Sequence, residues 1–128
     1  MDIEIARKGE IILAKIIGEI DHHTAEEVRR QLDGEIVSPG SRGLIFDLSA
    51  LTFMDTSGIG VMVGRYKNMM RLGGSTAIAG MNKQTKRVLT LTGFGRFLPF
   101  FDNVENAIEY IEKNNMTGRS GDYNAKVN

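Results

Sequence analysis

Residues 44–63, LIFDLSALTFMDTSGIGVMV, join a short apolar run to a helix that begins at a cluster of hydroxyl side chains. The run 44–48 is typical of a strand covered on both faces, although Asp47 lies within it. After Asp55, apolar residues recur at steps of three or four, which indicates an amphipathic helix. These residues are Ile59, Val63, Tyr66 and Met70. The stretch therefore predicts one strand-helix unit of an α/β sheet.

Upstream residues predict a hairpin and a first helix. Residues 3–17 contain two runs of alternating or β-branched apolar residues, and the glycine at position 9 separates them. Thr24 and Glu27 match a capping box, in which the threonine side chain bonds the Glu27 amide and the glutamate reaches back. Helical spacing of apolar residues then continues to Ile36. The apolar stripe of this helix is expected to face a sheet.

Downstream residues continue the alternation. Residues 76–79 predict a second buried strand, and Asn82 is positioned to cap a third helix. Pro99 restricts the aromatic stretch around it to a sheet edge or a loop. Asp102 and Glu105 then open a last helix. The resulting order, β-β-α-β-α-β-α-(β)-α, predicts an α/β fold: a mixed β-sheet flanked by about four helices.

The length and composition favour one small domain. The chain has 128 residues, which is enough to bury a core without disulfides or metals. We expect the domain to span residues 1–113 and residues 114–128, which lack periodicity, to form a flexible tail. Sixteen basic residues balance sixteen acidic ones, so the overall charge does not favour nucleic acid or an anionic membrane.

The residues that are missing exclude several classes of protein. There is no cysteine, which removes disulfides, thiolate catalysis and Cys-based zinc sites. The N-terminus lacks the pattern of a signal peptide, and no apolar run is long enough to span a membrane. These features predict a cytoplasmic protein.

The run Asp55-Thr56-Ser57 is suited to a helix start, because side-chain oxygens there accept bonds from the free amides of the first turn. The same free amides, with the positive end of the helix dipole, tolerate a phosphate on a nearby hydroxyl. A phosphate adds roughly −1.5 to −2 charge beside Asp55, and beside Asp21 if that loop lies close. Phosphorylation is therefore expected to release a partner rather than to recruit one.

Three glycines follow this cluster, although glycine costs about 1 kcal/mol relative to alanine inside a helix. We expect close packing on the sheet to explain Gly64, with Gly60 one turn before it. We expect Gly58 to leave the backbone open to a kinase or another binding partner.

Three motifs carry a family resemblance: GEIDHHTAE at residues 18–26, FMDTSGIGV at 53–61 and GRYK at 64–67. With them, the chain resembles the anti-sigma factor antagonists of the STAS superfamily, most closely the sporulation type, up to about Lys113. The resemblance implies the same mixed sheet flanked by helices. It also implies partner switching, in which the unmodified antagonist binds an anti-sigma factor that is also a protein kinase and so frees the sigma factor. Phosphorylation by that kinase inactivates the antagonist, and a phosphatase restores it.

The resemblance also implies the site residues. The acceptor is the hydroxyl residue after the motif aspartate, which is Thr56 here instead of the usual serine; Ser57 is the alternative. Such proteins are substrates and binders, not enzymes, and need no cofactor. The expected partner-binding residues are Asp21, His22, His23, Asp55, Thr56, Ser57, Gly58 and Ile59.

Other functions fit the sequence less well. His22 and His23 are adjacent and are the only histidines, so they do not predict a metal site. A phospho-aspartate receiver would need an acidic pair after the first strand, and a serine hydrolase would need a Gly-x-Ser-x-Gly motif, which Ser57 does not match. Arg65, Lys67 and Arg71 suggest a solvated helix face rather than a nucleic-acid site. The alternative that stays open is a STAS-type interaction module of a lipid-transport or stress-sensing complex.

Overall fold

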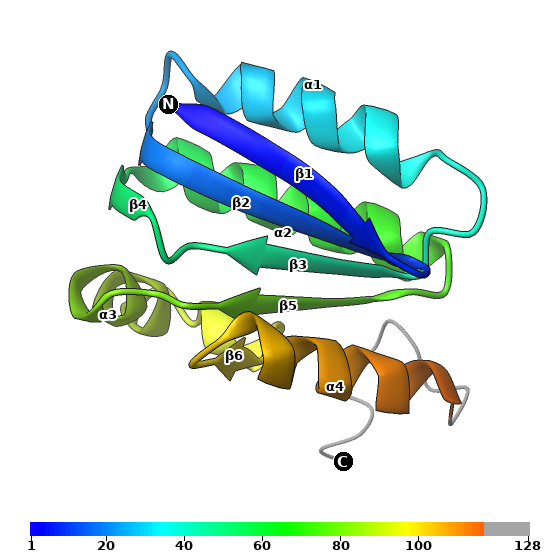
Figure 1. The fold of residues 1–128 in the computed structure, drawn as a ribbon. Helices are drawn as coiled ribbons and strands as arrows, with labels where there is room; N and C mark the ends of the chain where they lie inside the picture. Colours follow the sequence, from blue (N-terminus) through cyan, green and yellow to red (C-terminus); the bar gives the residue numbers. More distant parts are fainter. Residues whose placement is uncertain (117–128) are drawn as a thin grey trace.

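A computed structural model describes residues 1–116 of the chain, and Figure 1 shows their arrangement. The sheet is mixed, and helices cover both of its faces. The strands are β1 (Asp2–Lys8), β2 (Ile11–Ile20), β3 (Gly43–Asp47), β4 (Leu51–Met54), β5 (Ser75–Ala79) and β6 (Phe100–Phe101). The helices are α1 (Ala25–Ile36), α2 (Thr56–Arg71), α3 (Lys83–Leu91), the 3₁₀ turn η1 (Phe94–Arg96) and α4 (Val104–Met116).

The strand order is β1-β2-β3-β5-β6, and β4 pairs with the far end of β2. Among the strands of residues 1–116, the β1–β2 hairpin is antiparallel and the other pairs are parallel. β6 pairs with β5 at the edge of the sheet, as expected for the stretch around Pro99. The predicted mixed α/β sheet is confirmed.

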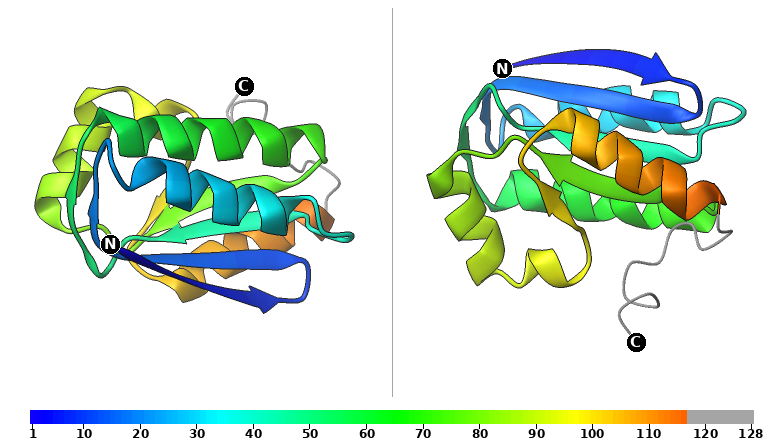
Figure 2. Two further views of the ribbon diagram at one scale, coloured as in Figure 1. Left: turned by 90° about the horizontal axis from the view of Figure 1, so that it is seen from above. Right: turned by 60° about the horizontal axis from the view of Figure 1, so that its bottom comes forward.

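Alternation along the strands divides the core between the two faces of the sheet. Ile12, Ala14 and Ile16 of β2 pack with α1 and α2 on one face. Ile11, together with Ile45 of β3, packs with α4 on the other. Figure 2 shows this layering, with α1 and α2 together and α4 on the opposite side of the sheet.

Strand β4 lies in a segment that the sequence pattern presents only as a connection. It has four residues, and only Leu51 is fully buried. β4 exists because β2 continues past Gly18 to Ile20 and offers it a parallel partner, with a shift of register between Gly18 and Glu19. That pairing joins distant parts of the chain and has no local signal.

The caps of α2 and α3 are as predicted, whereas those of α1 and α4 differ. Asp55 Oδ1 accepts a hydrogen bond from Ser57 N, and Asn82 Oδ1 accepts one from Thr85 N, both at 2.8 Å. At α1 the predicted capping box is wrong, because the Thr24 side chain makes no cap bond. At α4 it is Asn103, not Asp102, whose Oδ1 accepts from the first turn, at Asn106 N (2.8 Å).

The last helix extends three residues beyond the predicted domain boundary at Lys113. Asn114 is fully buried, and its Nδ2 donates to Ser75 Oγ at 3.1 Å. This bond ties the end of α4 to the start of β5, so residues 114–116 belong to the domain. The rest of the predicted tail, residues 117–128, lies outside the described residues.

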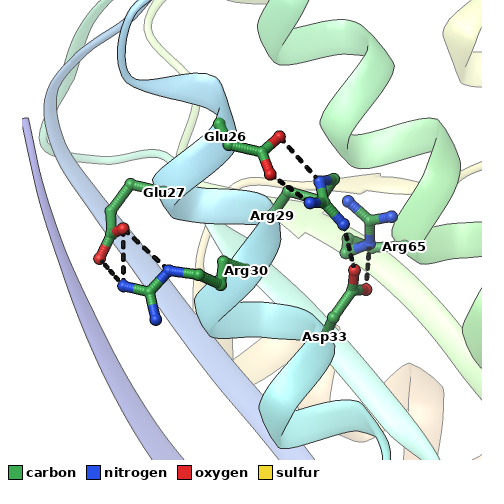
Figure 3. A network of polar contacts seen from close by, with 6 residues as sticks. All are labelled: Glu26, Glu27, Arg29, Arg30, Asp33 and Arg65. Carbon is green, nitrogen blue, oxygen red and sulfur yellow. Dashed lines mark hydrogen bonds and ion pairs between the residues drawn. The ribbon is translucent and has the colours of Figure 1, made fainter.

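The exposed-face interpretation is wrong for Arg65, which is only 7% exposed. It belongs to a network between α1 and α2 (Figure 3). Arg65 Nε lies 2.8 Å from Asp33 Oδ1, and Arg29 Nη1 lies 3.1 Å from Asp33 Oδ2. The Arg65 contact is an ion pair outside hydrogen-bond geometry, and burial lowers the pKa of its guanidinium. One carboxylate on α1 therefore balances a buried cation on α2.

In the part of the chain that the structure describes, no helix combines the length and the apolar character needed to cross a membrane.

Candidate phosphorylation and partner-binding site

The predicted site residues lie where β2 and β4 end side by side. The parallel ladder pairs Ile20 with Met54, and Asp55 N donates to Ile20 O at 3.1 Å. The loop that begins at Asp21 and Asp55, the single residue that joins β4 to α2, therefore lie next to each other at the same edge of the sheet (Figure 1). The predicted off-switch requires the Asp21 loop to lie close to the hydroxyl cluster, and this arrangement places it there.

The start of α2 presents one hydroxyl to solvent and partly covers the next. Thr56 is the first residue of the helix and is exposed, whereas Ser57 is half-buried. Asp55 holds this turn, since its side chain accepts from Ser57 N and its carbonyl accepts from Gly58 N at 3.1 Å. Within residues 1–116 the Thr56 hydroxyl makes no hydrogen bond, so it is free to act as a nucleophile toward an external phosphoryl donor.

The Asp21 carboxylate organises the neighbouring loop. Its Oδ1 accepts from His23 N at 2.9 Å and from Thr24 N at 3.0 Å. In return, Thr24 Oγ1 accepts from Asp21 N at 2.9 Å, which is why that hydroxyl does not cap α1. The bond from Thr24 N is the largest influence that lowers the pKa of Asp21, because it favours the ionised carboxylate. Asp21 therefore keeps its negative charge beside the start of α2 at neutral pH.

His22 and His23 are exposed at the tip of this loop, and their ring centroids lie 5.6 Å apart in an edge-to-face arrangement. Residues 1–116 contain no group of three or more His, Cys, Asp or Glu side chains placed to hold a metal ion. Both rings are thus exposed on the loop that follows β2.

The predictions for Gly58 and Gly64 of α2 are wrong, because the glycine that close packing requires is Gly58 and not Gly64. Gly58 is buried, and a Cβ there would overlap Met54 Cγ and lie 3.0 Å from Ile20 Cγ2. Gly58 is therefore required for close packing and does not leave the backbone open. A Cβ at Gly64 would meet no atom within 4 Å, so packing does not explain that glycine.

This difference predicts opposite effects for two identical substitutions. Gly64→Ala is expected to raise the free energy of unfolding by up to about 1 kcal/mol, because alanine favours the helix and nothing obstructs its methyl group. Gly58→Ala is expected to lower it by about 1–3 kcal/mol, because Met54 and Ile20 must move. Urea unfolding of the two variants measures both effects. Equal shifts would contradict the packing described for Gly58.

A small apolar patch, which the sequence pattern does not indicate, borders the site. Phe53 of β4 and Val88 of α3 are both about half exposed. They line a depression with a volume of about 440 Å³ between these two elements, next to Asp55. In the sequence, this patch is indicated only by an aromatic residue, Phe53, two positions before Asp55. Its exposure depends on β4 being an edge strand with one face open.

Comparison with known proteins identifies the family. Residues 2–107 match the model of the STAS domain. The chain belongs to the STAS domain family. The predicted sheet with its flanking helices is thus the STAS fold, and the hydroxyl cluster stands at the start of the second helix of a STAS domain.

Individual relatives of this STAS domain have regulatory names. A Paenibacillus polymyxa protein named anti-sigma F factor antagonist is 35% identical over 112 residues, covering 88% of this chain and 96% of the relative. The solved anti-sigma factor antagonist from Mycobacterium paratuberculosis superposes with a TM-score of 0.78 at 22% identity, covering 87% and 93% of the two chains. The Bacillus cell fate determinant SpoIIAA in its phosphorylated form gives a TM-score of 0.69 at 24% identity, covering 86% and 99%. The two structures show that the fold is shared.

Proposed function

We propose that this STAS domain is an anti-sigma factor antagonist controlled by phosphorylation. The unmodified protein binds an anti-sigma factor that is also a protein kinase, and so frees the sigma factor in the cytoplasm. The kinase then transfers the γ-phosphoryl group of ATP to the antagonist, and a phosphatase removes it. The antagonist is a substrate and a binder, not an enzyme. The observation that carries the proposal is the Thr56 hydroxyl at the start of α2, which is exposed beside the Asp21 loop and makes no hydrogen bond within residues 1–116.

Thr56 is proposed as the acceptor ahead of Ser57 on grounds of access. The transfer forms a bond between Thr56 Oγ and the γ-phosphorus, breaks the bond to ADP and releases the hydroxyl proton. Thr56 is exposed, and its neighbour Ser57 is half-buried with its amide bonded to Asp55. A kinase can approach the first hydroxyl without opening the first turn of the helix.

Electrostatics supports an off-switch. A phosphate of roughly −1.5 to −2 charge on Thr56 would stand next to two carboxylates, those of Asp55 and Asp21. The positive end of the α2 helix dipole compensates part of this charge within the molecule, so the fold survives. A partner whose surface fits the unmodified loop would instead meet an unmatched, strongly hydrated dianion.

A carboxylate at position 56 tests this repulsion without a kinase. We expect Thr56→Glu to weaken binding of the cognate anti-sigma factor by about tenfold or more, since like charges at an interface cost several kcal/mol. Isothermal titration calorimetry measures the dissociation constant, and circular dichroism checks the fold.

Asn106→Glu is the matched control for added charge. Asn106 is exposed in the first turn of α4, on the opposite face of the sheet. This variant should bind as wild type. Equal binding by both variants would count against repulsion at the start of α2.

A further inference from the structure

A second surface of α2 remains without a role. A groove with a volume of about 690 Å³ runs between α2 and the segment that follows α3. We call it the α2–η1 groove. It is lined by Ile59, Val63, Tyr66, Lys67, Met70, Thr92, Phe94, Phe97 and Leu98. Most of these side chains are apolar, and several are incompletely covered.

The α2 wall of the groove is the apolar stripe that the sequence pattern shows. The core buries a neighbouring face of the helix, through residues such as Val61, Met62 and Met69. The stripe from Ile59 to Met70 spans twelve residues, whose eleven steps cover about 16 Å of helix. Met70 is 40% exposed and Phe97, on the opposite wall, is 47% exposed. The groove is therefore long enough for about three turns of another helix.

The chain segment that includes both walls of the groove carries charge of one sign. Residues 56–101, which form both walls, contain no Asp or Glu. They contain seven basic residues: Arg65, Lys67, Arg71, Lys83, Lys86, Arg87 and Arg96. The overall balance of sixteen charges of each sign conceals this segregation. Lys67 lines the groove and is exposed, and Arg96 is exposed beside Phe97 in the chain. Arg65 instead pairs with Asp33, and the three basic residues of α3 line other depressions. An apolar ligand with acidic flanks would match this surface.

The groove is continuous with the phosphorylation site. Ile59, at its near end, is one helical turn from Thr56. On the adjoining outer side of α2, Gly60 and Gly64 carry no side chain, and a Cβ at either would meet no atom within 4 Å. A partner that covers Thr56 can thus lie closely along the helix.

We propose that the α2–η1 groove binds an amphipathic helix of the anti-sigma factor, with apolar residues facing the groove and Asp or Glu residues on its flanks. This inference rests on the proposed function, because it names the same partner. The groove holds that partner helix beside the Thr56 hydroxyl. A phosphate on Thr56 would therefore act at one end of the contact surface.

Removal of two exposed apolar side chains tests the anchor. We expect Met70→Ser/Phe97→Ser to raise the dissociation constant of the cognate anti-sigma factor about tenfold or more, because buried aromatic anchors carry much of the energy of an interface. The matched control, Val37→Ser/Leu91→Ser, removes two exposed apolar side chains outside the groove and should bind as wild type. Circular dichroism confirms folding of both.

Charge reversal tests the acidic flanks. Lys67→Glu should weaken binding in dilute buffer, and the difference from wild type should shrink at about 0.5 M salt, where exposed charges are screened. A difference that does not depend on salt would contradict the charge match.

The outcomes separate the two proposals. If wild type binds and the Met70→Ser/Phe97→Ser variant binds equally well, the groove proposal fails and the proposed function stands. If wild type does not bind the anti-sigma factor, both fail. Sedimentation with phosphatidylglycerol vesicles is the third arm. Binding of wild type to these vesicles, lost in the same variant, would assign the groove to a membrane and overturn the protein occupant.

Discussion

Treatment with the cognate kinase and ATP is expected to leave the Thr56→Ala variant unlabelled, while Ser57→Ala is labelled like wild type. The reason is the difference in access between two adjacent hydroxyls. Thr56 is exposed and unbonded within residues 1–116, and Ser57 is half-buried in the first turn of α2. Mass spectrometry of the peptide that contains both residues locates the phosphate.

The double variant Thr56→Ala/Ser57→Ala is the control for this experiment. It should carry no phosphate and should keep the fold. The Asp55 side chain still caps α2, because it accepts its hydrogen bond from the backbone amide of residue 57. Labelling of the double variant at the wild-type rate would exclude the hydroxyl cluster as the acceptor. Loss of label in Ser57→Ala alone would move the acceptor to Ser57.

Asp33→Ala is expected to lower the free energy of unfolding by about 2–4 kcal/mol, although Asp33 lies outside the proposed partner-binding site. Asp33 is the counter-ion of the buried Arg65 and also contacts Arg29 and Asn68 Nδ2, the last at 3.2 Å. Its removal leaves a guanidinium inside the α1–α2 interface without a counter-ion at contact distance. Urea unfolding followed by circular dichroism measures the loss.

Two further variants show whether the cause is the buried charge. Glu27→Ala breaks an exposed ion pair with Arg30 on the same helix (Figure 3) and should cost about 0.5 kcal/mol or less. Asp33→Ala/Arg65→Met removes both charges and should recover much of the loss. If Asp33→Ala costs no more than Glu27→Ala, Arg65 does not depend on this carboxylate.

Local patterns were sufficient for most elements of the fold. The hairpin, the helix starts at Asp55 and Asn82, and the buried strands follow from periodicity and capping chemistry, which act over a few residues. β4 could not be predicted in this way, because it is ordered by pairing with β2, more than thirty positions earlier. The burial of Arg65 likewise depends on Asp33, which lies on another helix.

The candidate site shows the same division. Asp55 and Thr56 stand where the motif and the capping pattern place them, and β2–β4 pairing brings the Asp21 loop beside them. The roles of Gly58 and Gly64 were exchanged in the prediction, because only the packed neighbours decide whether a methyl group fits. The side chains of the α2–η1 groove form a helical stripe, and a stripe alone does not tell which side of it the core covers.

A phosphate on Thr56 is proposed to switch partner binding off. The most direct measurement compares the affinity of the cognate anti-sigma factor for the unmodified protein and for the protein phosphorylated at Thr56, with occupancy verified by mass spectrometry. We predict a dissociation constant raised about 100-fold, equivalent to about 2.7 kcal/mol, and full recovery after phosphatase treatment. Equal or tighter binding of the phosphorylated protein would contradict an off-switch at Thr56.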